Sequence, residues 1–155
     1  MTAPHHACQC ACGATRFSVQ GPPLLRGFCH CTICQEFNQS AFADISVYRA
    51  GDVAMPDSDT LEFRAYRPPP AVQRGRCKAC GGPAIEVMQI FPLPRLIIVP
   101  SGHLPAACRR DPALHVFYNS RQADVDDDLP KYSGYWKSQL AFGRRLLGAL
   151  LRGPA

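Results

Sequence analysis

The chain has 155 residues, of which 46% are hydrophobic and 19% charged, the balance expected of one globular domain with its own core. Its formal charge of +5 is uneven, because residues 137–155 contain Lys137, Arg144, Arg145 and Arg152 but no acidic residue, and the remainder is about neutral. This pattern excludes a dedicated nucleic-acid-binding protein, and no apolar run approaches the roughly 18–20 residues of a membrane-spanning helix.

Nine cysteines occur in the chain, and an odd number argues against a framework of disulfides. Residues 1–6 contain no apolar run of the kind found in a signal peptide. We therefore expect a reducing, cytoplasmic location, where clustered cysteines more often bind metal ions than one another.

The first cysteine cluster contains Cys10 and Cys12, which are followed by Gly13. Glycine at this position lets the backbone turn so that its N–H groups face the sulfur atoms. Cys8 precedes the cluster and leaves open which thiols act as ligands, although we interpret Cys8 as an exposed spare thiol.

Short strands, separated by turns rich in proline and glycine, are predicted by the alternation of apolar and polar side chains. The fold class is therefore mainly β. We expect strands at residues 14–19, 24–28, 42–48, 61–66, 85–87, 96–99 and 114–118, and a short helical turn at residues 33–38.

The second cluster places three thiols, Cys29, Cys31 and Cys34, within six residues. Cys31 and Cys34 have the spacing at which two sulfur atoms reach one metal ion, and Cys29 adds a third. Three thiolates with no fourth ligand in the same turn predict a metal ion with an open coordination position. We expect His30 to point away from the metal and to act as a polar neighbour.

The third cluster contains Cys77 and Cys80 followed by Gly81, the strongest single zinc-knuckle signal in the chain. Together with Cys10 and Cys12 it completes four sulfur ligands, the number that a closed structural zinc site needs. Loss of this metal should destabilise much of the fold, because the metal would join distant parts of the chain.

Cys108 stands alone beside Arg109 and Arg110, and we interpret it as a small core residue in preference to a reactive thiol. Residues 124–128 contain four acids without the spacing of a calcium loop, and we interpret them as a solvated turn.

Residues 137–152 predict an amphipathic helix with basic residues on one side. Packing of its apolar side on the body is the favoured interpretation, a homodimer contact comes second, and binding to a membrane surface is the least favoured. We therefore divide the chain into a zinc-binding β domain, residues 1–136, and a basic helical tail, residues 137–155. The apolar side would contain Leu140, Phe142, Leu146, Leu147, Leu150 and Leu151.

The three clusters, in this order, resemble those of the glutathione-dependent formaldehyde-activating enzyme family, also called the centromere protein V family. The resemblance extends from about Cys8 to Tyr132. The matching motifs are Cys10-Ala11-Cys12-Gly13, Cys29-His30-Cys31-Thr32-Ile33-Cys34 and Cys77-Lys78-Ala79-Cys80-Gly81, followed by residues 112–116 and 127–132.

The resemblance implies a β-tent fold, in which zinc pins twisted antiparallel sheets. It implies a carbon–sulfur lyase that joins formaldehyde to glutathione, giving S-hydroxymethylglutathione, with a small thiol as its partner molecule. It also implies a structural zinc on Cys10, Cys12, Cys77 and Cys80, and a second, labile zinc on Cys29, Cys31 and Cys34, where a substrate thiol reaches the metal and the chemistry occurs. Three residues depart from the family pattern: Gln35, Arg76 and Ala123.

Three thiolates leave one corner of a zinc tetrahedron vacant, and a substrate thiol bound there would lose its proton to become a nucleophile. The three anionic sulfur atoms also weaken the ion as a Lewis acid, so we favour activation of a thiol over activation of water. The alternative is a non-catalytic interaction module in which both metals are structural. An electron carrier with iron on four sulfur atoms is a weaker third hypothesis.

Overall fold

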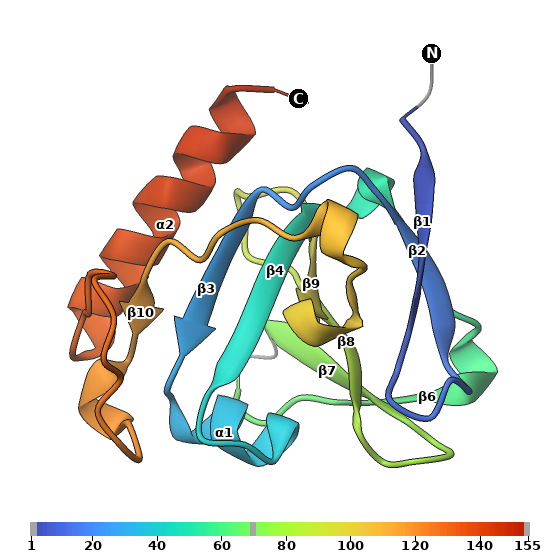
Figure 1. Cartoon of the computed structure of the whole chain (residues 1–155), viewed down its shortest axis with the longest axis horizontal. Helices are drawn as coiled ribbons and strands as arrows, with labels where there is room; N and C mark the ends of the chain where they lie inside the picture. The colour runs from blue at the N-terminus through green and yellow to red at the C-terminus, as the bar shows by residue number, and fades with distance from the viewer. Residues whose placement is uncertain (1–2, 69–70, 154–155) are drawn as a thin grey trace.

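The computed structural model describes residues 3–68 and 71–153, which fold mainly into β-strands (Figure 1). The helices are α1 Thr32–Asn38 and α2 Tyr135–Leu151, and short 3₁₀ turns occupy Ala50–Asp52, Ser58–Thr60, Ser101–His103, Ala106–Cys108 and Tyr118–Ser120. The strands are β1 His5–Gln9, β2 Arg16–Gln20, β3 Leu25–Cys29, β4 Ala43–Arg49, β5 Val53–Ala54, β6 Leu61–Arg64, β7 Val72–Cys77, β8 Pro83–Met88, β9 Leu96–Pro100 and β10 His115–Val116.

Two sheets are formed by these strands. The larger sheet has the order β10-β3-β4-β9-β8-β7-β6, and the smaller has the order β1-β2-β5. Neighbouring strands pair antiparallel, except that β10 runs parallel to β3. The predicted fold class, mainly β with antiparallel sheets and a C-terminal helix, is therefore confirmed, and each predicted strand lies within two residues of an observed one.

The strands β1, β5 and β7 were not predicted from the sequence. In β1 only Cys8 is buried, so the segment lacks the regular alternation that marks a half-buried strand. It becomes a strand because it pairs with β2 in a hairpin, where Cys8 lies opposite Phe17. The strand β5 has two residues, too few for a recognisable pattern.

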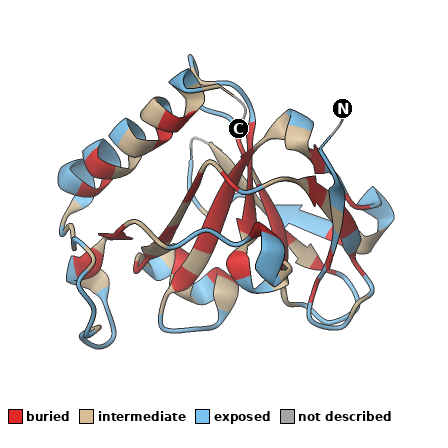
Figure 2. Cartoon of the chain, turned by 45° about the horizontal axis from the view of Figure 1, so that its top comes forward, coloured by how far each residue is buried: buried red, intermediate tan, exposed pale blue. Residues whose placement is uncertain are grey.

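The core has two parts because the central strands of the larger sheet are buried on both faces. On β9, Ile97 and Val99 belong to a cluster shared with Phe17 and Val19 of the smaller sheet. The alternate residues Leu96 and Ile98 belong to a second cluster, on the side that α2 covers. Figure 2 shows that buried positions run along the central strands of the larger sheet.

Helix α2 packs against β10 and β3 at one edge of the larger sheet (Figure 1). Its buried residues are Ser138, Ala141, Leu146 and Ala149, and three of these four are small, which lets the helix approach closely. The Ser138 hydroxyl accepts a hydrogen bond from the Phe117 N–H at 2.8 Å and joins the helix to the segment after β10.

The apolar face assigned to this helix from its sequence is only partly correct. Leu146 is buried against the sheet, but Leu140, Leu147 and Leu151 are exposed on the outer side. The sequence pattern could not tell which of two apolar stripes meets the sheet. Within the described part of the chain, no helix has both the length and the apolar character needed to cross a membrane.

Candidate metal centres

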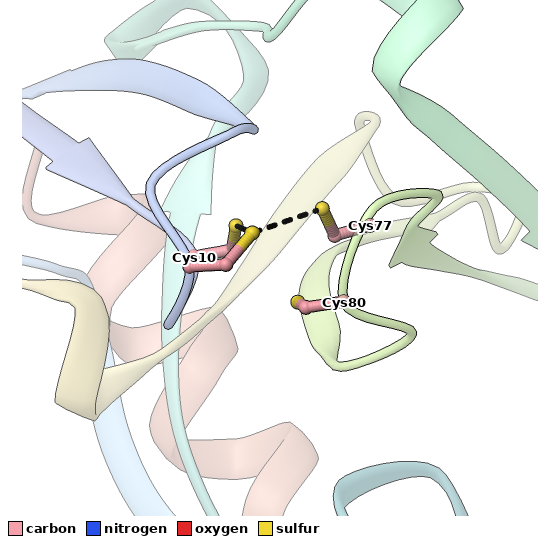
Figure 3. Close-up of side chains that lie close together, drawn as sticks. Cys10, Cys77 and Cys80 are labelled. Carbon is pink, nitrogen blue, oxygen red and sulfur yellow. Dashed lines mark hydrogen bonds between the residues drawn. The ribbon is translucent and has the colours of Figure 1, made fainter.

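Four thiols from two turns meet where the smaller sheet approaches the larger one (Figure 3). Cys10 and Cys12 lie in the turn between β1 and β2, whereas Cys77 and Cys80 lie at the turn between β7 and β8. Their four sulfur atoms lie within 4.8 Å of one another, with Cys12 Sγ at 3.5 Å from Cys10 Sγ and 3.7 Å from Cys77 Sγ. The structure thus brings together the four residues that the sequence predicted as one set.

Each turn is shaped to present its thiols. Gly13 and Gly81 have φ angles of +79° and +72°, in the left-handed region that favours glycine. The Gly81 N–H donates to the Cys77 carbonyl at 2.8 Å and closes the turn between the two thiols. Three further backbone N–H groups, those of Ala14, Thr15 and Gly82, lie 3.4 Å from the sulfur atoms of Cys12, Cys10 and Cys80 respectively.

These N–H groups favour thiolates, which are the form of cysteine that binds a metal ion. Burial opposes ionisation of Cys77, but hydrogen bonds from the Thr15 side chain and the Cys80 backbone lower the pKa of its thiol to about 6. Four sulfur donors with N–H groups directed at them fit a structural zinc or iron ion and leave no ligand position for a substrate.

The second set of thiols lies at the junction of β3 and α1. Cys29 ends β3, Cys31 caps the N-terminus of α1, and Cys34 lies in its first turn, with all three sulfur atoms within 4.8 Å of one another. The Cys34 N–H lies 3.3 Å from Cys31 Sγ. Cys29 and Cys34 are buried, but Cys31 is only partly so. This three-thiol cluster therefore opens to solvent on the side of Cys31.

The negative charge of this three-thiol cluster is concentrated on Cys31. Hydrogen bonds from the Cys29 and Cys34 thiols lower the pKa of Cys31 to about 3. Contact with Cys31 raises the pKa of Cys29, and contacts with Cys29 and Cys31 raise the pKa of Cys34. The protein alone therefore stabilises one thiolate, and a bound cation is needed to ionise all three. Three sulfur donors fit a zinc ion that retains one open position.

Arg74 supplies a positive charge beside this cluster. It lies on β7, and its side chain is only 12% exposed, between the thiols and Glu86 on the neighbouring strand. Arg74 Nε lies 3.7 Å from Glu86 Oε1, and the guanidinium also attracts Cys34 and Cys31. Full burial raises the pKa of Glu86 to about 7, although Arg74 opposes this shift. Neither residue was predicted from the sequence, because the two meet through the register of β7 and β8.

A chain of hydrogen bonds runs from His30 away from the thiols. His30 Nε2 lies 2.8 Å from His115 Nδ1, and His115 Nε2 lies 2.8 Å from Asp127 Oδ2. Hydrogen bonds from Lys131 and His115 lower the pKa of Asp127 to about 2, so the carboxylate accepts from His115. Between His30 Nε2 and His115 Nδ1, one nitrogen donates the hydrogen bond and the other accepts it.

The expectation that His30 points away from the three-thiol cluster agrees with this geometry. Burial and the neighbouring His115 and Arg121 lower the pKa of His30 to about 4, which keeps its ring neutral at pH 7. The four acids of residues 124–128 are exposed, as the predicted solvated turn requires, and Asp127 also contacts His115 and Lys131. Nothing in the local sequence marks this role, because His115 and Asp127 meet through the fold of the loop after β10.

Gln35 holds α1 against the segment that follows β10. Its side-chain amide donates to the His30 carbonyl at 2.6 Å and to the Ser120 carbonyl at 2.8 Å. On the outer side of α1 lies an open, mostly polar hollow of about 490 Å³, which starts at the residue after Cys31. The hollow is lined by Thr32, Gln35, Glu36, Gln39, Ser40, Ala41 and Gln122.

The two remaining cysteines join neither cluster. Cys8 is buried in the core between the sheets, which corrects its interpretation as an exposed thiol, and burial raises its pKa to about 11. Cys108 is buried in the same core, and burial also raises its pKa, as suits a small core residue. The choice between Cys8 and Cys10 as ligand thus falls to Cys10, whose sulfur lies in the four-thiol cluster.

Comparison with known proteins agrees with this arrangement. Residues 5–120, which include both clusters, match the glutathione-dependent formaldehyde-activating enzyme family. Among solved structures, the fold is similar to that of a protein from Rhodobacter sphaeroides, with a TM-score of 0.53 and 15% sequence identity over 82% of this chain and 99% of that chain. No curated protein matches the sequence.

Proposed function

Since the chain belongs to the glutathione-dependent formaldehyde-activating enzyme family, we propose that it is a zinc-dependent carbon–sulfur lyase. Its substrate is the adduct of a small thiol with formaldehyde, of the S-hydroxymethylglutathione type, which it forms or cleaves. The observation that carries this proposal is the incomplete three-thiol cluster of Cys29, Cys31 and Cys34, with Cys31 partly exposed.

The two clusters have different roles in this proposal. Cys10, Cys12, Cys77 and Cys80 form a complete set of four, so we assign them a structural zinc. Within residues 3–68 and 71–153, no fourth cysteine, histidine or carboxylate joins the second set. We therefore assign the second, exchangeable zinc to this set, and the catalytic chemistry to the place left beside it.

The reaction joins the thiol sulfur to the carbonyl carbon of formaldehyde. The π electrons of the carbonyl pass to its oxygen, which gains the proton that the thiol loses, and cleavage reverses these changes. Bound zinc supplies positive charge that favours the thiolate form of a neighbouring thiol.

The residues of the chain hold this site in shape. Cys31 keeps the anionic charge of the cluster, and Arg74 offsets part of it from the buried side. The hydrogen bonds from Asp127 through His115 to His30 fix the backbone between the first two thiols. The polar hollow that begins at Thr32 offers amide and carboxylate groups to the peptide bonds of a thiol such as glutathione.

The test measures exchange between glutathione with formaldehyde and their adduct, by two-dimensional NMR with ¹³C-labelled formaldehyde. Zinc-loaded protein should raise the exchange rate above the spontaneous rate, and Cys31→Ser should abolish the increase. Cys108→Ala, which changes a cysteine outside both clusters, is the matched control and should keep it. No increase by the wild type would reject glutathione as the thiol. Unchanged turnover of all tested thiol adducts by Cys31→Ser would reject the catalytic role of the cluster.

The alternative is a non-catalytic interaction module with two structural metals, and the exposed apolar residues of α2 favour it. Metal counting combined with thiol competition separates the two hypotheses. A second metal that never admits an added thiol would support the interaction module. A second metal whose ligand environment changes with added glutathione, followed with cobalt in place of zinc, would support the enzyme.

A further inference from the structure

Helix α2 carries a second apolar surface that is largely exposed. Trp136, Leu140, Leu147 and Leu151 are between 48% and 81% exposed. At 100° per residue their positions fall within about 60° of one another, opposite the face of Ser138 and Ala149 that meets the sheet. We call these four residues the outer stripe, and it extends for about 22 Å along the helix.

The surroundings of the outer stripe are basic. Helix α2 contains Lys137, Arg144 and Arg145 but no acidic residue. Lys137, Arg144 and Arg145 line a hollow of about 540 Å³ beside Leu140. A second hollow, of about 300 Å³, follows the helix further along. It is lined by Leu24, Leu25, Arg26, Arg110, Asp111, Ala113, Arg144, Arg145, Gly148 and Arg152, so five arginines and one acid face it.

We propose that α2 docks the protein on an anionic lipid bilayer. The outer stripe enters the boundary between headgroups and acyl chains, and Lys137 and Arg144 meet the lipid phosphates. Interfacial helices combine a tryptophan- and leucine-bearing face with lysine and arginine beside it, as α2 does. The helix lies in the plane of the membrane, because it lacks the length and apolar character to cross one.

Charge favours this occupant over a second copy of the chain. Pairing two α2 helices along their outer stripes would bring together two basic helices that contain no acid themselves. An anionic bilayer instead attracts each cation near its surface.

The orientation of α2 also suits docking, because the face that packs on the sheet lies opposite the outer stripe, and exposed residues line the outer side of α2 (Figure 2). The inference does not depend on the proposed reaction.

The test uses the zinc-loaded full chain and two kinds of vesicle, pure phosphatidylcholine and phosphatidylcholine with phosphatidylserine. Trp136 is the single tryptophan of the chain, so its fluorescence reports on the outer stripe alone. We expect co-flotation with the anionic vesicles only, a blue shift of the Trp136 emission, and a decline of binding as salt rises.

Four variants separate the contributions. Leu147→Gln combined with Leu151→Gln should weaken binding more than about tenfold, and because both residues are exposed the fold should survive. Lys137→Gln combined with Arg144→Gln should weaken it roughly 30-fold. Met55→Gln removes an exposed apolar residue outside α2, and Arg64→Gln a cation on β6, the sheet edge opposite β10. Both controls should bind like the wild type.

Other outcomes would overturn the proposal. Equal binding to both kinds of vesicle would show that the basic residues do not select anionic lipid. Binding without a change in Trp136 emission would show that the outer stripe does not enter the bilayer. A doubled mass in light scattering that Leu147→Gln reverses would assign the stripe to a second copy. The same emission shift with poly-glutamate, and none with vesicles, would assign it to an acidic protein.

Discussion

Replacing Cys80 with serine should detach the β7–β8 turn from the β1–β2 turn. Cys80 is exposed, so the substitution removes a sulfur ligand without opening a cavity in the core. The cluster joins Cys12 to Cys77, which are 65 residues apart, and a cross-link over such a loop restricts the unfolded chain by about 4 kcal/mol. Since a domain is stable by only about 5–15 kcal/mol, Tm should fall by about 8–16 °C.

The assay combines elemental analysis of bound metal with thermal unfolding followed by circular dichroism. Cys80→Ser should bind one metal ion fewer than the wild type and should show the fall in Tm given above. Cys31→Ser is the matched variant in the other cluster and should also lose one metal ion. Its Tm should change much less, because three thiols within six consecutive residues close no long loop. Equal losses of Tm in the two variants, or two metal ions retained by Cys80→Ser, would refute this reasoning.

Three further substitutions test the groups around the three-thiol cluster. Arg74→Gln should raise the pKa of Cys31 and weaken the second metal about 10–100-fold in chelator competition, whereas an unchanged affinity would remove Arg74 from the site. Burial raises the pKa of Glu86 to about 7 from 4.5, so the folded protein holds a proton that the unfolded chain has lost, and stability should decrease as pH rises from 4.5 to 7. Glu86→Gln should flatten this slope in urea unfolding, and a slope like that of the wild type would contradict the assignment. Hydrogen bonds from Lys131 and His115 lower the pKa of Asp127 from 3.8 to about 2, so its ionised form stabilises the fold above pH 3.8 and this contribution is lost as pH falls to 2. Asp127→Asn should be less stable than the wild type near pH 5, and its stability should fall less between pH 4 and 2, as followed by circular dichroism. Equal acid unfolding of the two proteins would argue against this role of Asp127.

The ligand sets were accessible from the sequence because cysteines close together in a turn must lie close together in space. Cys77 and Cys80 are three residues apart, and Cys10 and Cys12 are only two apart, so each pair forms half of a site wherever the chain places it. The two halves could be combined from the sequence because a closed structural zinc site needs four sulfur ligands. The structure places the four sulfur atoms together.

Features that depend on side-chain packing were not accessible in this way. Cys8 is buried because β1 pairs with β2, although the segment itself has no strand pattern. Helix α2 has two apolar stripes, and only its small residues at Ser138, Ala141 and Ala149 show, once the sheet edge is known, which side packs.

The sequence by itself determined the mainly β class, the two sets of thiols and the incompleteness of the second set, because strand alternation and ligand spacing are local properties of the chain. Only the tertiary structure decided which side chains surround that second set. His115 reaches His30, 85 residues earlier in the chain, because β10 pairs with β3, and Arg74 reaches Glu86 because β7 pairs with β8. Such contacts arise from strand register, and no spacing along the chain encodes them.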